Sequence, residues 1–436
     1  MHLDAERTGE STETPNGLFG LAVLSLCGGA LSGLLGAVFR LSLDRADQLR
    51  DELIAGAHGK TVMGFFLVVV ICAAATAAAA YLVRRFSPQA EGSGIPHVEA
   101  VVRGELPAAL YRLIPVKFFG GLLAIGSGLA LGREGPSVQM GASIAHLLGR
   151  VFHRNDNDCK TLLAAGAGAG LATAFNAPIA GSAFVLEELV RRFDTRITIA
   201  TLGASAGAIV MARVLLGDKP DFYVEQLPYT GFGTMAIHLA LGVVAGFLGV
   251  FYNRVLLVTL AAMEHLRRWP VELRAGLIGA IVGITAWFAP GWVGGGDAIT
   301  QRTLAGTETV AVLPIIFLFR FVLGAVSYAA RTPGGLFAPM LVLGAQSGFL
   351  FGILCNQWFP AAAINPTVLA VVGMAAFFTA VVRAPLTGIV LVIEMTASFT
   401  LLLPMLGACF AAILVPTLLR NAPIYDSLRE RSLKRA

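Results

Sequence analysis

Three short segments combine glycine and proline and then continue as apolar helical runs: GSGIP (92–96), GREGP (132–136) and GLFAP (335–339). Proline is favoured at the first helical position, where its missing N–H is not needed, and glycine lets the main chain approach a ligand closely. The free N–H groups and positive dipole end of such a helix bind anions. We therefore predict a small-anion site where the three starts converge. For each motif alone, a turn between packed helices is the alternative.

Arg133 and Glu134 lie in the otherwise apolar tract LGREGPSVQMGA (131–142). A charge inside a membrane costs about 2.5–3.5 kcal/mol on insertion scales, so its presence indicates a function. One hypothesis is a structural ion pair between the two residues, although adjacent side chains rarely face each other at a helix start. The other is that the Glu134 carboxylate itself occupies the anion site. When ionised it blocks the pathway, and when protonated it swings out and admits the anion.

The composition of the chain is that of a membrane protein. Of its 436 residues, 56% are hydrophobic and 14% are charged, with a mean hydropathy of +0.75, whereas soluble domains carry about a quarter charged residues. Continuous apolar runs of about 20 residues recur from Gly17 to Arg420, which favours membrane-spanning helices over a barrel. The net charge of +5 does not indicate nucleic-acid binding, because the cations cluster at segment ends, as the positive-inside rule expects.

An internal repeat divides the chain into two halves. Residues 166–188 align with 373–395 without a gap, with seven identities in 23 positions. Residues 132–142 align with 335–345, so that GREGP corresponds to GLFAP, which has no carboxylate. Transporters with such repeats bind substrates near the midplane, where interrupted helices end. The alternative is chance similarity between helices rich in glycine and alanine, and the pattern leaves open whether the halves are inverted.

A second pair of carboxylates, Glu187 and Glu188, ends an apolar segment just before two arginines. One interpretation is a solvated helix end with i,i+4 ion pairs. The repeat separates the two residues. Glu187 recurs as Glu394, which indicates a structural cap in both halves, whereas Glu188 faces Met395 and is unique to the first half. Glu188 is therefore the better candidate for a proton relay.

Four further polar residues fit the same site. Ser93 adds a hydroxyl donor to the first Gly-Pro motif. Lys117 either raises the local positive potential or extends its amine to the interface, and Glu99 is expected to pair with Arg133 or Lys117. Tyr425 follows the last long apolar run, where an interfacial tyrosine is the simpler interpretation and a hydroxyl donor to the anion is the alternative.

In this order and at these separations, the three motifs resemble those of the CLC family of chloride channels and chloride/proton exchangers. NAPIAGSAFVLEE (176–188) and PIYDSL (423–428) also match, so the resemblance covers about residues 18–430. It implies an all-α polytopic membrane protein with a CLC-type fold of two inverted structural repeats, containing many tilted and partial helices. It also implies a homodimer in which each subunit has its own pathway.

The family pattern assigns roles to individual residues. Ser93 and Tyr425 hold the central chloride through their hydroxyls, and the backbone amides of Leu336 and Phe337 contribute. Glu134 is similar to the external gating glutamate and proton acceptor. Glu188 is similar to the internal proton-transfer glutamate that marks exchangers. The remaining expected anion-binding positions are Gly132, Arg133, Gly135 and Gly335.

The sequence and the resemblance together predict a chloride/proton antiporter, with a passive chloride channel of the same fold as the alternative. No nucleophile–base pair or metal-ligand set indicates an enzyme, and we expect no cofactor and no nucleic-acid partner, with chloride and protons as substrates. We expect a homodimer in the cell (inner) membrane with both termini cytoplasmic, of the prokaryotic type without C-terminal CBS domains. The expected divisions are a polar N-terminal segment (1–16), a transport domain (17–420, with repeats at about 17–216 and 233–420) and a short C-terminal helix (421–436).

Overall fold

The structure is a computed structural model that describes residues 15–59, 61–109, 111–225, 227, 232–266, 268–360 and 364–434. Most of the predicted N-terminal segment therefore lies outside the described residues. Within them the chain is all α, with two isolated β-bridges. The helices of the first half are α1 (Pro15–His58), α2 (Thr61–Phe86), α3 (Ile95–Val102), α4 (Leu113–Gly126), α5 (Glu134–Val151), α6 (Asp156–Phe175), α7 (Pro178–Phe184) and α8 (Thr195–Leu216).

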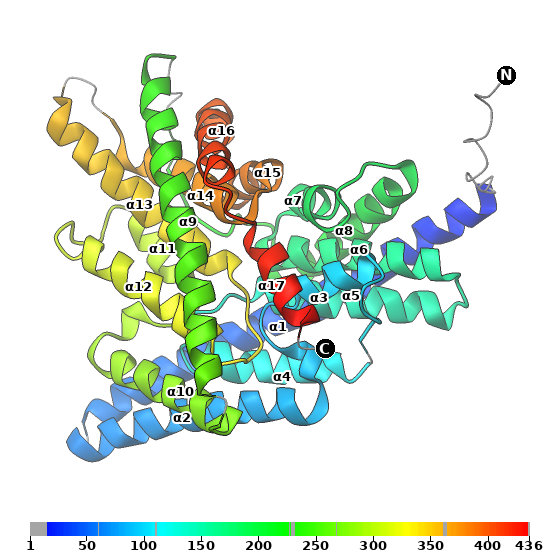
Figure 1. Ribbon diagram of the computed structural model, residues 1–436, viewed down its shortest axis with the longest axis horizontal. Helices are drawn as coiled ribbons and strands as arrows, with labels where there is room; N and C mark the ends of the chain where they lie inside the picture. Colours follow the sequence, from blue (N-terminus) through cyan, green and yellow to red (C-terminus); the bar gives the residue numbers. More distant parts are fainter. Residues whose placement is uncertain are drawn as a thin grey trace.

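The second half contains an equivalent set of helices. Its helices are α9 (Met235–His265), α10 (Val271–Phe288), α11 (Asp297–Leu304), α12 (Leu313–Tyr328), α13 (Phe337–Trp358), α14 (Pro366–Val382), α15 (Pro385–Thr396) and α16 (Leu402–Leu418), followed by α17 (Ile424–Leu433). The pairings are equivalent, because α1 packs on α8 as α9 packs on α16, and α5 packs on α6 as α13 packs on α14. In Figure 1, α5–α8 gather on one side, α13–α16 gather on the other, and α17 lies between them.

Seven helices within the described residues are long and apolar enough to cross a membrane, namely α1, α2, α8, α9, α10, α13 and α16. Their burial differs: the most hydrophobic part of α13 is 78% buried inside the molecule, whereas that of α2 is 28% buried. The outer helices expose large apolar side chains, including Phe66 and Phe247. An apolar exterior of this kind suits a lipid environment, so the predicted polytopic membrane protein is confirmed.

Several helices are too short to span a bilayer, which takes about 20 residues. Helix α3 has 8 residues, α7 has 7 and α15 has 12. The breaks before α7 and α15 are equivalent, because the preceding helices end at Asn176 and Arg383 in the left-handed conformation (φ 49° and 72°). An alanine and then a proline follow each of these residues, and the proline opens the next helix. The two repeats thus interrupt their helices at the same place.

Glycine allows the helices within each repeat to approach closely. A Cβ on Gly141 would collide with the Gly166 carbonyl oxygen between α5 and α6, and a Cβ on Gly344 would lie 2.6 Å from the Gly373 carbonyl oxygen between α13 and α14. Both pairs are related by the sequence repeat. Small residues at such crossings are typical of helix packing in membranes, where van der Waals contact drives association.

Candidate functional site

The loops that carry the three Gly-Pro motifs are joined by backbone hydrogen bonds at the centre of the molecule. The Gly132 N–H donates to the Gly335 oxygen at 2.9 Å, and the Gly335 N–H donates back to Gly132 at 2.7 Å. The Gly92 N–H donates to Thr332 at 3.1 Å, and the Gly334 N–H donates to Gly92 at 3.1 Å. The starts of α3, α5 and α13 therefore converge, as the sequence predicts.

Glu134, the first residue of α5, is fully buried and points at the start of α13. Its Oε1 accepts hydrogen bonds from the backbone N–H of Phe337 at 2.7 Å and of Ala338 at 3.3 Å. Its Oε2 has no hydrogen-bond partner among the described residues. The carboxylate thus occupies the N-terminal end of α13, where free amides and the helix dipole favour an anion.

Two glycines make room for this carboxylate. A Cβ on Gly132 or on Gly335 would overlap the Glu134 carboxylate oxygens. A Cβ on Gly135 would lie 2.7 Å from both the Ser93 backbone oxygen and the Ser93 Oγ. The GREGP motif therefore packs directly against Ser93. These three predicted positions therefore lie at the site, and they shape it through the absence of a side chain.

The ion pair proposed between Arg133 and Glu134 is wrong, because Arg133 binds other carboxylates. Its Nη1 lies 2.6 Å from Asp297 and its Nη2 lies 3.2 Å from Asp221, while its Nε donates to the Ala174 carbonyl at 3.0 Å. Asp221 is also paired with Arg40 at 2.7 Å. The Arg133 guanidinium is thus held by two acidic side chains.

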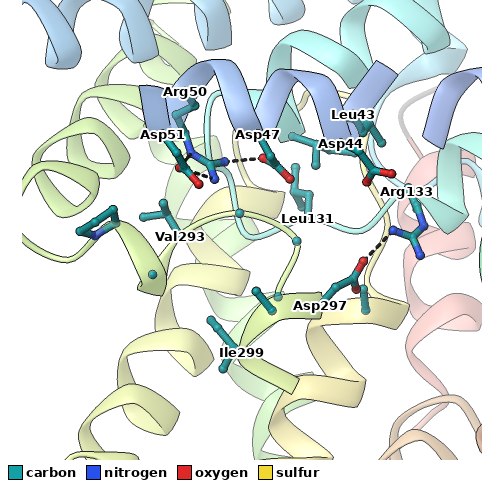
Figure 2. Close-up of a pocket in the computed structure, with 18 of the residues that line it drawn as sticks. Leu43, Asp44, Asp47, Arg50, Asp51, Leu131, Arg133, Val293, Asp297 and Ile299 are labelled. Carbon is teal, nitrogen blue, oxygen red and sulfur yellow. Dashed lines mark hydrogen bonds and ion pairs between the residues drawn. The ribbon is translucent and has the colours of Figure 1, made fainter. Parts of the chain in front are cut away.

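A pocket reaches the site from the side of Arg133. It is lined by Gly132, Arg133 and Ala338, and by charged side chains of α1 and α11 (Figure 2). Figure 2 shows these charges in separate ion pairs, with Arg50 bound to Asp47 and Asp51 of α1, and Arg133 bound to Asp297. The pocket reaches Gly132 and Ala338, which both lie next to the Glu134 carboxylate, whereas Glu134 itself is buried and does not line it.

The two hydroxyls expected to hold the anion are both buried and unpaired. The Ser93 Oγ and the Tyr425 OH have no hydrogen-bond partner among the described residues. Tyr425 is 0% exposed, which excludes the interfacial interpretation, and its ring stacks on Phe337 with centroids 6.0 Å apart. Buried polar groups are usually paired, so two unpaired hydroxyls at the converging helix starts, Ser93 against Gly135 of α5 and Tyr425 against Phe337 of α13, indicate a site for a ligand or water.

Lys117 supports the loop that carries Ser93. It is fully buried and donates to the backbone oxygens of Ala90 at 3.1 Å and of Gly92 at 2.7 Å. The amine therefore does not extend to the membrane interface. The Ser93 N–H donates to the hydroxyl of Tyr328 at 3.3 Å, which fixes the same loop from the other side.

Glu187 and Glu394 cap each other's repeat. The Glu187 carboxylate accepts hydrogen bonds from Leu386 N–H at 3.0 Å and Thr387 N–H at 2.7 Å, at the start of α15. The Glu394 carboxylate accepts from Ile179 N–H at 3.1 Å and Ala180 N–H at 2.8 Å, at the start of α7. The predicted structural caps are confirmed, and each acts across the boundary between the halves.

Glu188 and Glu99 lie together at a different place from Glu134. The Glu188 side chain is 3% exposed, and both of its oxygens lie 3.4 Å from the Arg191 Nη2. Glu99 is fully buried and pairs with Arg103 at 2.6 Å, so the expected pairing with Arg133 or Lys117 is wrong. In both cases the partner is an arginine three or four residues further along the chain.

Sequence reasoning missed several residues that complete the site. Asp221, Asp297 and Tyr328 come from loops or helix ends far along the chain from the motifs they contact. Only Asp297 carried a signal, because it follows three glycines directly before α11 and so resembles the other glycine-led helix starts.

Comparison with known proteins identifies relatives over nearly the whole chain. The voltage gated chloride channel family matches residues 75–417. The H(+)/Cl(-) exchange transporter ClcA of Cronobacter sakazakii is 38% identical over 430 residues, covering 97% of this chain and 91% of the relative. The ClcA protein of Vibrio parahaemolyticus is 36% identical over 424 residues, covering 95% and 90%.

Solved structures share the fold. A slow cyanobacterial Cl−/H+ antiporter superposes with a TM-score of 0.90 at 32% identity, covering 95% of this chain and 98% of the other. A CLC-type fluoride/proton antiporter, at 23% identity and the same coverage, shows a similar fold with a TM-score of 0.77. The predicted resemblance and the predicted fold class are both confirmed.

Proposed function

Because the chain belongs to the voltage-gated chloride channel family, we propose that it is a coupled chloride/proton antiporter. The observation that carries the proposal is the Glu134 carboxylate, whose Oε1 accepts the Phe337 N–H at 2.7 Å. This is the backbone amide that the family pattern gives to chloride. A carboxylate and a chloride ion cannot use the same N–H at once, so they compete for the start of α13.

Protonation decides this competition. The ionised carboxylate is attracted by the free amides and the positive end of the α13 dipole. A protonated carboxyl group is neutral and loses most of that attraction, so chloride replaces it. Oε2, which has no partner among the described residues, is the oxygen available to accept the proton. Each exchange of chloride for Glu134 thus takes up or releases one proton at this residue.

In the proposed bound state, chloride is held by neutral donors. The Ser93 and Tyr425 hydroxyls, buried without partners, donate to it together with the amides of Leu336 and Phe337. Arg133 does not contact the anion in this proposal, since its guanidinium is held by Asp221 and Asp297. Donors without a full charge bind a small anion and still allow it to leave, which transport requires.

Glu188 is the proposed second proton site. It is buried, lies beside the Glu99–Arg191 ion pairs, and belongs to the element that follows α7. Two carboxylates at different places on the protein allow protons to move by a route that differs from that of chloride. A passive chloride channel of the same fold has no need of a buried carboxylate here, so Glu188 favours the exchanger.

The proposed setting follows from the family and from the distribution of charge. We place the protein in the cell (inner) membrane as a homodimer, with both termini cytoplasmic and one pathway in each subunit. The transported species are chloride and protons, and the proposal requires no cofactor, metal or enzymatic step.

Reconstitution of the purified protein into liposomes tests the proposed function. The liposomes start with equal chloride on both sides and a lumen more alkaline than the outside. Protons that enter down the pH gradient must then drive radioactive chloride out of the lumen, against the chloride gradient that builds up. Dissipating the pH gradient with a protonophore must abolish this movement. Chloride that only equilibrates, with no dependence on the pH gradient when the membrane potential is clamped at zero, indicates the passive channel.

A further inference from the structure

One guanidinium links Glu188 to the helix that carries Tyr425. The Arg191 Nη2 lies 3.4 Å from both Glu188 oxygens. Its Nη1 and Nη2 donate to the Asp426 carboxylate at 3.2 and 3.1 Å. Asp426 directly follows Tyr425 on α17. The proposed proton-transfer residue and the proposed chloride ligand are therefore connected through two ion pairs that share one arginine.

The backbone before Arg191 has an unusual conformation that places this side chain. Residues Val185–Leu189 form a π-helical turn, closed by a hydrogen bond of 2.9 Å from the Val190 N–H to the Val185 oxygen. Arg191 itself has a φ of 55°, and its Nε donates to the Glu188 backbone oxygen at 3.2 Å. Such π-turns are frequent at functional sites. A non-glycine residue at positive φ is uncommon and persists where the surrounding contacts enforce it.

The charged groups around this link come from three elements. From α3 and the turn after it, Arg103 binds Glu99 at 2.6 Å. From α17, Arg429 binds Glu105 at 3.0 Å and lies 3.5 Å from Asp426. The segment after α7 contributes Arg191, whose Nη2 also lies 3.7 Å from the Glu99 carboxylate. The neighbouring Arg192 faces outward, with its side chain 67% exposed, and pairs with Asp194 at 3.3 Å.

The balance of charge makes the cluster sensitive to Glu188. It contains four carboxylates, from Glu99, Glu105, Glu188 and Asp426, and three guanidinium groups, from Arg103, Arg191 and Arg429. Protonation of Glu188 leaves equal numbers of the two charges. Of the carboxylates on the body of the protein, Glu188 lies nearer to Arg191 than Glu99 does, at 3.4 Å against 3.7 Å, whereas Asp426 binds the arginine from α17.

We propose that Arg191 is a positioning residue that couples the protonation of Glu188 to chloride binding at Tyr425. When Glu188 is ionised, Arg191 is fixed from both sides and holds α17 with the Tyr425 hydroxyl at the site. When Glu188 is protonated, Arg191 loses its side-chain ion pair with Glu188 and keeps only the hydrogen bond to the Glu188 backbone oxygen and the 3.7 Å contact with Glu99. The guanidinium is then less firmly oriented, α17 is held less firmly, and chloride binds more weakly. By linkage, bound chloride then disfavours the protonation of Glu188 to the same extent.

This inference rests on the proposed chloride role of Tyr425, and calorimetric chloride binding by the full-length protein in detergent tests it without transport. Glu134→Gln serves as the background, because it removes the competing gate and its titration. Chloride affinity is measured between about pH 4 and pH 9, a range that spans the protonation of a buried carboxyl group. We expect the chloride Kd to rise about fivefold or more towards the acidic end, within the usual range for coupled sites.

Added substitutions decide whether Arg191 carries the coupling. Arg191→Gln and Glu188→Gln must each remove the pH dependence, and Asp426→Asn must do so from the α17 side, whereas Arg191→Lys keeps part of it. Arg192→Gln is the matched control, since it removes an adjacent cation that does not touch Glu188, and it must leave the pH dependence unchanged.

Retention of the full pH dependence in both Arg191→Gln and Asp426→Asn overturns the proposal, as does a chloride Kd that falls on acidification. If instead the coupling is found but the wild type moves no protons in liposomes, the proposed antiport fails and the linkage stands.

Discussion

Glu134 and Phe337 occupy equivalent positions in the two repeats, and the Glu134 carboxylate accepts a hydrogen bond from the Phe337 N–H at 2.7 Å. Each is the first residue of its helix, α5 or α13. The neighbouring equivalent pair, Gly132 and Gly335, exchanges reciprocal hydrogen bonds in an antiparallel bridge. The two repeats therefore meet around a local twofold axis at the site, and the side chain of one repeat blocks the helix start of the other.

Replacing the carboxylate should separate chloride transport from proton transport. We expect Glu134→Gln to retain chloride flux and to lose proton movement, because the amide cannot ionise to compete for the α13 amides or carry a proton. Simultaneous recording of chloride and pH in a liposome suspension measures both. Glu52→Gln, on a 66% exposed side chain of α1, is the control and should behave as the wild type. Proton pumping by Glu134→Gln would contradict the gating role.

Acidification should increase chloride flux in the wild type. Glu134 blocks the site when ionised, so flux is low at high pH and rises as protons neutralise the carboxylate. The measurement is initial chloride efflux at a series of pH values, equal on both sides of the membrane. In Glu134→Gln the part of the pH dependence that comes from the gate should be absent. A wild-type flux that falls on acidification would show that the ionised carboxylate opens the pathway.

The adjacent residues Glu187 and Glu188 should respond differently to the same substitution. Glu188→Gln should stop proton movement while chloride still passes. Glu187→Gln should keep the coupling but lower the thermal unfolding midpoint, since it weakens hydrogen bonds that cap α15, each worth about 1.5–3 kcal/mol when the acceptor is charged. Flux recordings and detergent unfolding curves test the pair. Unchanged proton coupling in Glu188→Gln would leave that residue with a structural role alone.

Removing either unpaired hydroxyl should weaken chloride binding. Tyr425→Phe and Ser93→Ala each delete a donor to the anion, and a hydrogen bond to a charged group is worth about 1.5–3 kcal/mol, or roughly a tenfold to hundredfold change in affinity. Titration calorimetry with chloride measures the loss. Tyr81→Phe, at a 44% exposed tyrosine of α2, is the matched control. An unchanged Kd in both site variants would mean that the buried hydroxyls serve the protein interior and not the anion.

The sequence predicted the features that local patterns encode. Glycine and proline marked the starts of α3, α5 and α13, and the repeat predicted that Glu187 and Glu394 play one structural role. It did not predict the partners of Arg133, because Asp221 and Asp297 lie 88 and 164 residues away and only the tertiary fold brings them together. The sequence also did not predict that Lys117 lies under the Ser93 loop, because the burial of Lys117 depends on how α4 packs against its neighbours.

If chloride and protons exchange through one competition at Glu134, a chloride gradient must drive protons across the membrane against their own gradient. Liposomes loaded with chloride are diluted into chloride-free buffer at equal pH, and the external pH is recorded while the chloride gradient runs down. Chloride that leaves the wild-type liposomes should drive protons inward against the gradient that builds up, and a protonophore should abolish this signal. Chloride efflux with no such proton uptake, in protein that binds chloride, would contradict it.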